Sequence, residues 1–418
     1  MTKRCLTPIR HIALRALRGA LLSYTEEWIM KRMMCAWLAA CVVFGSAGAT
    51  FAGDALVATA DSVSAAVAAV PSLDAVVFEG PAVEIGMDAV IEHHLTSGPA
   101  IELALINKRS DDAIARGYKD ALDLLELAAP ASLNAKLADM TRNFARANLE
   151  TNHAAELNSI RRSAAELFLN TFRAQEYRRV AWDDLTAASL TLQNVQRKFQ
   201  LGAASKLDVL TATNARLAAE KAHADARVGH AAALMHFNME MGYPLLQDVK
   251  LIADLSVPDL PVVDLDAAIA SALEKRNEVG GVKFAYEIQD VSFRNAKLTK
   301  HPQSTDYRKQ EVAWLEAKYA ADRIEDQMRA DVLLKYMGLA QKHLAAIAAQ
   351  NTVELSQEAY RISKISYGVG MNTLAELQKA EVAAGQARIL AIGAITDLSL
   401  ALLDFEFATD VGTYRVRL

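Results

Sequence analysis

Two long stretches of the chain place apolar residues on one helical face without interruption. Between residues 131 and 201 there is no Gly and no Pro, and apolar residues recur three and four positions apart, as at Ile160, Ala164 and Phe168. The stretch 303–367 follows the same pattern and contains a single glycine. At 1.5 Å per residue, the two stretches predict helices of about 105 Å and about 95 Å. Such lengths are typical of coiled coils, membrane spans or helical repeats, and the interspersed charges exclude a lipid-facing span.

The chain is duplicated. Residues 199–210 match residues 367–378, because each segment begins with an aromatic residue and continues, at intervals of three, with a glycine, a hydroxyl residue and an acid. Residues 87–95 match residues 265–273, and each of these segments opens a helical pattern after a proline-containing stretch. Two matches in the same order indicate a repeated architecture.

The repeats and their flanks divide the chain into six segments. In order, these are a leader (1–52), a loose N-terminal tail (53–84), helical hairpin repeat 1 (85–242), a linker (243–263), helical hairpin repeat 2 (264–412) and a C-terminal tail (413–418). The linker contains three prolines and an alternating run at 249–255 that favours one strand.

A glycine separates two helical stretches in each repeat. Gly202 and Gly370 can end one helix in the left-handed conformation, and Ser205 or Thr373 can cap the next. The helices then fold back antiparallel, with 131–201 against 205–241 in the first repeat and 303–369 against 373–408 in the second. We therefore predict a mainly all-α fold of two tandem long antiparallel helical hairpins.

The leader has the pattern of a secretory signal peptide. Lys31 and Arg32 precede an apolar run at 33–44, and small residues follow to Ala52. About 12 apolar residues are too few to span a bilayer, so we expect an exported protein. Two alternatives stay open: a start at Met30 or Met33, with residues 1–29 as an upstream extension, and lipidation at Cys41, which ends a lipoprotein-like box at 38–41.

Composition excludes several classes of function. All three cysteines lie in the leader, so the mature chain has no disulfide or thiolate metal site. The leader holds seven of the 45 basic and two of the 50 acidic residues, which leaves a net charge of −10 and argues against nucleic acid as a partner. No phosphate loop, nucleophile elbow or paired catalytic carboxylate is present, and we expect neither an enzyme nor a cofactor. His223 and His230 are seven positions apart, which is too wide for one metal site on one helix.

The chain resembles the outer-membrane efflux protein (TolC) family in the turn motif of each repeat. The motif consists of an aromatic-x-x-Gly turn, a hydroxyl residue three positions on and an acid after it. The resemblance covers nearly all of 85–412. The resemblance implies a coiled-coil α-barrel subunit in a homotrimeric tunnel of twelve helices. It also implies that the turns are periplasmic tips that close the entrance and dock a periplasmic adaptor protein, which connects the tunnel to an inner-membrane transporter.

The resemblance assigns roles to single residues at the tips. Asp208 and Tyr367 correspond to two members of the latch that holds neighbouring hairpins shut, and Asn372 stands where the family has the latch arginine. Glu376 corresponds to the inner of two acids that line the entrance, and Lys379 stands at the second. The expected tip and docking residues are Phe199, Gly202, Ser205, Asp208, Tyr367, Gly370, Asn372 and Thr373.

One departure from the family concerns the membrane. Family members insert a β-hairpin between the first two helices of each repeat, and such strands need about ten residues each. Residues 128–132 and 300–306 are too short for two strands, so we expect little or no β-barrel. The sequence therefore favours an efflux conduit in the outer membrane or periplasm. The alternative is a barrel-less periplasmic coiled-coil scaffold or a non-conducting paralogue.

Overall fold

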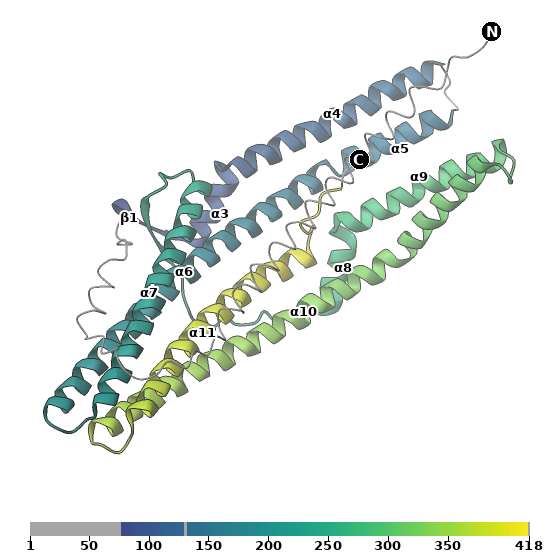
Figure 1. Cartoon of the computed structure of the whole chain (residues 1–418). Coiled ribbons are helices and arrows are strands. Elements are labelled where there is room, and N and C mark those ends of the chain that lie inside the picture. Colours follow the sequence, from purple (N-terminus) through teal and green to yellow (C-terminus); the bar gives the residue numbers. More distant parts are fainter. Residues whose placement is uncertain (1–76, 129–131, 417–418) are drawn as a thin grey trace, which may run out of the picture. The chain divides into compact units, whose positions relative to one another are not determined.

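The computed structural model describes residues 77–128 and 132–416 (Figure 1). The expected signal peptide, the three cysteines and the first part of the N-terminal tail lie outside the described residues. Over the described residues, the chain is almost entirely helical and has a single two-stranded sheet. The predicted all-α class is confirmed.

The helices form two sets in which the order of elements recurs. The first set is α3 (Met87–Thr96), α4 (Pro99–Ala128), α5 (Leu133–Ala147), α6 (Leu149–Gln200) and α7 (Lys206–Glu240); the second is α8 (Leu265–Lys275), α9 (Asn277–Thr299), α10 (Thr305–Gly368) and α11 (Leu374–Thr409). In each set a short helix precedes a medium one, and a long helix packs against its return partner, α6 against α7 and α10 against α11. The recurrence supports the proposed duplication, while its exact boundaries stay a prediction.

The two predicted long helices differ in continuity. The helix α10 runs unbroken for 64 residues, as expected, and passes through Gly338. The expected helix over 131–201 is instead interrupted at Asn148, so the prediction of one continuous rod was wrong there. The side-chain amide of Asn148 donates to the carbonyl of Phe144 at 2.9 Å, and such local bonds compete with helix propagation.

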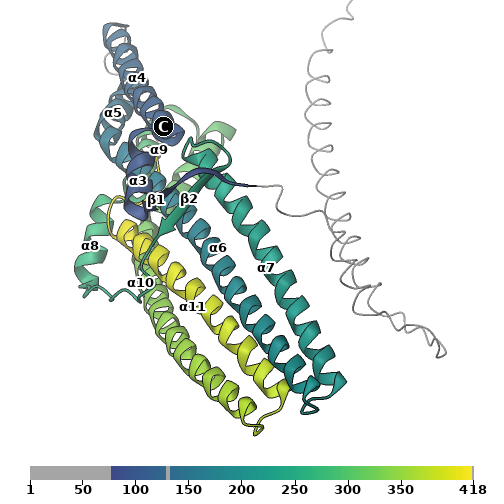
Figure 2. The same ribbon diagram turned by 90° about the vertical axis from the view of Figure 1, so that its left-hand side faces the viewer.

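The end of the expected loose tail, residues 79–84, forms a strand instead. The strand β1 (Glu79–Gly86) pairs in parallel with β2 (Gln247–Ile252), with Ile85 opposite Leu251 (Figure 2). The linker strand thus exists, although it begins two residues before the expected run. The side chain of Gln175 on α6 binds both backbone groups of Leu251, at 2.9 and 3.0 Å, which fixes this strand to the helix.

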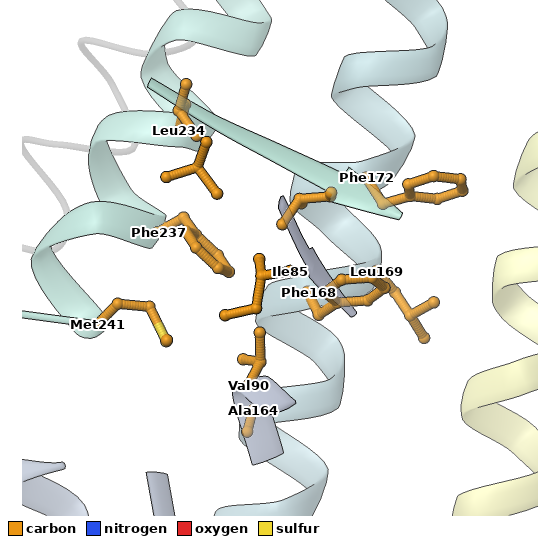
Figure 3. Packing of buried hydrophobic residues seen from close by; sticks show 11 residues of the cluster. Ile85, Val90, Ala164, Phe168, Leu169, Phe172, Leu234, Phe237 and Met241 are labelled. Atoms are coloured by element: carbon orange, nitrogen blue, oxygen red, sulfur yellow. The ribbon is translucent and has the colours of Figure 1, made fainter. Parts of the chain in front are cut away.

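The largest cluster of buried side chains lies where the strands meet α3, α6 and α7. Phe168 and Phe237 are fully buried there, beside Ile85 and Val90 (Figure 3). Removing a side chain of this size from water stabilises the fold by about 1.5–3 kcal/mol. The cluster therefore anchors both strands to the first set of helices.

The connections at the far ends of the medium helices are short. Four residues join α4 to α5, of which Ser132 is described and caps α5 by accepting from the N–H of Ala135 at 3.2 Å. Five residues join α9 to α10, and Ser304 caps α10 in the same way. The described residues of both connections contain no strand, as expected. None of the described helices has an apolar segment long enough to cross a bilayer.

The two sets meet along an antiparallel seam between α6 and α11. Arginines pair across it at three levels: Arg162 with Asp404 at 2.7 Å, Arg173 with Asp397 at 2.5 Å, and Arg388 with Asp183 at 2.9 Å and Asp184 at 2.6 Å. At the third level, Gly385 faces Asp184, and a Cβ on this glycine would overlap the Asp184 carboxylate.

The C-terminal residues 412–416 form a strap across both sets. Asn152 on α6 binds both the N–H and the carbonyl of Val416 at 3.0 Å, and Asn277 at the start of α9 donates to the carbonyl of Tyr414 at 3.1 Å. Arg415 pairs with Asp111 at 2.5 Å. The two asparagines are 3% exposed, and the strap supplies hydrogen-bond partners to both of these buried side chains.

Candidate functional site: the two hairpin turns

The two turns that reverse the chain have the same backbone geometry. Gly202 follows α6 with φ of +73°, and Gly370 follows α10 with φ of +81°. The N–H after each glycine bonds back into the last helical turn, Ala203 to Lys198 at 2.7 Å and Met371 to Ser366 at 2.8 Å. This is the Schellman arrangement, which only a residue able to adopt positive φ closes without strain.

Each return helix begins with the same reciprocal cap. The Ser205 hydroxyl accepts from the N–H of Asp208 at 3.1 Å, while the Asp208 carboxylate accepts from the N–H and the hydroxyl of Ser205, both at 2.8 Å. Thr373 and Glu376 repeat this box at the start of α11. These bonds lower the pKa of both carboxyls, so both acids are ionised at neutral pH. The expected caps are confirmed.

Large apolar side chains project from both turns into solvent. Leu201 and Met371 are 84% and 81% exposed, and Val369 and Leu207 are more than two-thirds exposed. Phe199 is half exposed. Exposed apolar groups gathered at one end of a structure are typical of a contact surface.

A contact between the two turns holds them side by side (Figure 2). Lys198 on α6 donates to the backbone carbonyl of Tyr367 on α10 at 2.7 Å, and its ammonium lies 3.8 Å from the centre of the Tyr367 ring. Beneath this contact, Leu374 of α11 packs against Leu192 and Val195 of α6. The turns of the two repeats therefore form one joint surface within a single chain.

The expected latch pair is close but not bonded. Burial first, and then the Asp208 charge, raises the pKa of Tyr367, so the two groups are electrostatic neighbours. Among the described contacts, however, the Asp208 carboxylate is engaged by Ser205, and the residue that binds Tyr367 is Lys198. Lys198 was not predicted from the sequence. The only local indication of its role is its position next to Phe199, the aromatic residue that begins the turn motif.

The remaining predicted residues occupy the same end of the molecule. The Asn372 amide donates to the Ser363 hydroxyl at 3.2 Å and so stays within its own hairpin. Glu376 is held in its capping box, and Lys379 is exposed on α11. Among the described residues, no group of three or more His, Cys, Asp or Glu side chains is arranged to hold a metal ion.

The sequence matches no protein-family model and no curated protein. Solved structures show what it is similar to. CusC, from a study of its folding and transmembrane channel formation, superimposes with a TM-score of 0.63 at 12% identity over 82% of this chain and 97% of that one.

Two further outer membrane proteins give the same result. VceC of Vibrio cholerae has a TM-score of 0.59 at 12% identity, over 78% of this chain and 97% of its own. The open state of the MtrE channel of Neisseria gonorrhoeae has a TM-score of 0.59 at 14% identity, over 79% of this chain and 90% of its own. The chain therefore has the fold of TolC-type outer membrane channels.

Proposed function

We propose that the chain is a subunit of an exported, TolC-like efflux conduit rather than an enzyme. The observation that carries this proposal is the duplicated turn: two Schellman glycines, two capping boxes and four exposed apolar side chains lie on one joint surface. The similarity to outer membrane channels supports the same conclusion. In this proposal the turn surface receives a periplasmic adaptor, which connects the conduit to an inner-membrane transporter.

The exposed surface of α10 supports association of several copies of the chain, and we propose a homotrimer, as the resemblance implies. Apolar side chains recur along this helix mostly at intervals of three, four, seven and eleven, which places them on one side. Those more than half exposed from residue 334 to the end of the helix and its C-cap are Leu334, Met337, Leu344, Leu355, Ile362, Ile365 and Val369. A long apolar stripe of this kind is unfavourable in water unless another helix covers it. We propose that a second copy of this chain covers it.

Site-specific cross-linking tests the docking of the adaptor. Removal of the expected leader would remove all three cysteines, so Leu201→Cys and Met371→Cys would each introduce a single thiol at the turns. We expect both variants to cross-link in cells to a periplasmic adaptor protein. Leu298→Cys is the matched control, because Leu298 is 87% exposed but lies at the end of α9. Equal cross-linking from all three positions, or none from the turns, would contradict docking at the turns.

A second candidate is a periplasmic scaffold or a non-conducting paralogue. The short connections α4–α5 and α9–α10 favour it, because their described residues contain no strand. Deletion of the gene distinguishes the two candidates. A conduit predicts greater sensitivity to toxic compounds in the deletion strain, whereas a scaffold that conducts nothing predicts unchanged sensitivity.

A further inference from the structure

A small cavity lies within the described structure between α6, α7 and α11. Its volume is about 440 Å³, which is within the range of pockets for small organic molecules. Its α6 and α7 walls consist mainly of alanines: Ala181, Ala188, Ala215, Ala218, Ala219, Ala222 and Ala226. The ring of Tyr177 adds an aromatic surface. The α7 wall is therefore apolar, whereas the α6 wall adds the polar side chains of Asp184 and Thr191 to its alanines.

The third side, on α11, carries two polar side chains with unsatisfied atoms. Glu381 is 9% exposed, and its Oε1 atom is buried without a hydrogen-bond partner among the described residues. Gln378, one turn earlier and also in the wall, has a buried Nε2 atom in the same condition. Buried polar atoms are nearly always satisfied in folded proteins, so this wall has the features of a site that a ligand completes.

The charges around Glu381 leave a surplus of negative charge. On α6, Asp183 and Asp184 share one cation, Arg388 of α11. Lys364 and Tyr360 approach Glu381 from α10, but Lys364 makes no ion pair with it in the described structure. Three carboxylates therefore face two cations, and Glu381 is the one without an ion pair.

The protonation of Glu381 reflects this environment. Burial raises the pKa of Glu381 to about 7, the Asp184 charge adds to the rise, and Lys364 opposes it. Burial, followed by the charges of Glu381 and Asp184, also raises the pKa of Tyr360 to about 12. The carboxyl is therefore partly neutral at pH 7 in the empty cavity, and a bound cation would favour its ionised form.

We propose that this cavity binds a small amphiphilic organic cation, with the charged nitrogen against the Glu381 carboxylate and the apolar part against the alanine wall. The Tyr177 ring lines the same cavity and offers a flat surface for the apolar part. A neutral amphiphile would leave the carboxylate unpaired, and a small inorganic cation would leave the apolar walls unused. This inference goes beyond the proposed function, because binding needs only α6, α7 and α11 of one chain.

Fluorescence titration of the purified full-length chain with ethidium at pH 8 tests the site. We expect Glu381→Gln to weaken ethidium binding at least tenfold, because the variant keeps the shape of the side chain and removes its charge. Ala219→Leu, which fills the cavity, should weaken it to a similar degree. Glu354→Gln is the matched control: Glu354 is an exposed acid on α10, and its loss should change the affinity less than twofold. Circular dichroism establishes that each variant is folded.

Two further measurements separate this site from general attraction of a cation to an acidic protein. Lowering the pH from 8 to 5.5 should weaken ethidium binding to the wild type several-fold and leave Glu381→Gln unchanged. Binding of the neutral dye N-phenyl-1-naphthylamine should respond to Ala219→Leu and not to Glu381→Gln. Wild-type affinity in folded Glu381→Gln would overturn the assignment. That result would leave the conduit proposal intact, because adaptor cross-linking does not involve the cavity.

Discussion

The two long helices α6 and α10 occupy corresponding places in the two sets of helices but are buried to different extents. In α6, 17 of 52 residues are buried, whereas in α10 only five of 64 are. The helix α6 packs against α3, α4, α7 and α11, and α10 packs against α8, α9 and α11. The two helices therefore end in the same kind of turn, while their neighbours decide how much of each helix is buried.

The largest expected effect is at the centre of α6. Phe168→Ala removes a fully buried ring from the main cluster, and we expect it to lower the free energy of unfolding by about 3–5 kcal/mol. Leu344→Ala on α10 removes a side chain that is 67% exposed and should cost less than about 0.5 kcal/mol in dilute protein. Urea denaturation followed by circular dichroism measures both.

Protein concentration sharpens this first comparison. If a second copy covers α10, the cost of Leu344→Ala should grow as the protein concentration rises, whereas the cost of Phe168→Ala should stay constant. Equal costs for the two variants in dilute protein would show that the stated difference in burial between the helices is wrong.

A smaller effect is expected at the seam. Gly385→Ala on α11 places a Cβ against the Asp184 carboxylate, and we expect a loss of about 1–3 kcal/mol in the free energy of unfolding. Gly338→Ala on α10 is the matched control, because no neighbouring atom lies within 4 Å of its added Cβ. This control should stabilise the protein by about 0.5–1 kcal/mol through helix propensity alone. A stabilising Gly385→Ala would show that the two helices are not in close contact there.

The smallest effect depends on pH. The pKa of Glu381 is raised from 4.5 to about 7 in the folded chain, so the stability that this group contributes falls as the pH rises from about 4.5 through 7. Glutamine stays neutral throughout, and we therefore expect Glu381→Gln to raise the free energy of unfolding by about 1–2 kcal/mol at pH 8 and by little at pH 4. Glu354→Gln should show no such dependence in the same denaturation series, and a Glu381→Gln effect equal at both pH values would contradict the assigned pKa.

The turns could be predicted because their determinants are local. A glycine, a hydroxyl residue and an acid at intervals of three specify a Schellman turn and a capping box within ten residues of chain. Gly202, Ser205 and Asp208 show this geometry in the structure, as do their counterparts in the second repeat. The continuity of α10 followed from periodicity in the same way.

The features that the sequence did not predict depend either on residues far away in the chain or on side chains that compete with the helix for backbone hydrogen bonds. The interruption at Asn148 arises from a side chain that can bond its own backbone, which apolar periodicity does not register. The strand β1 becomes ordered through β2, more than 160 residues later. The Lys198–Tyr367 contact and the buried Glu381 depend on how the two hairpins pack, and no spacing in the sequence reports that packing.

The C-terminal strap bears on when the fold can be completed. Asn152 and Asn277 come well before their backbone partners Val416 and Tyr414 in the sequence. Because a ribosome makes a chain from its N-terminus, these bonds can form only after residues 412–416 have been made. The junction between α6 and α9 is therefore among the last parts of the described fold to close during synthesis.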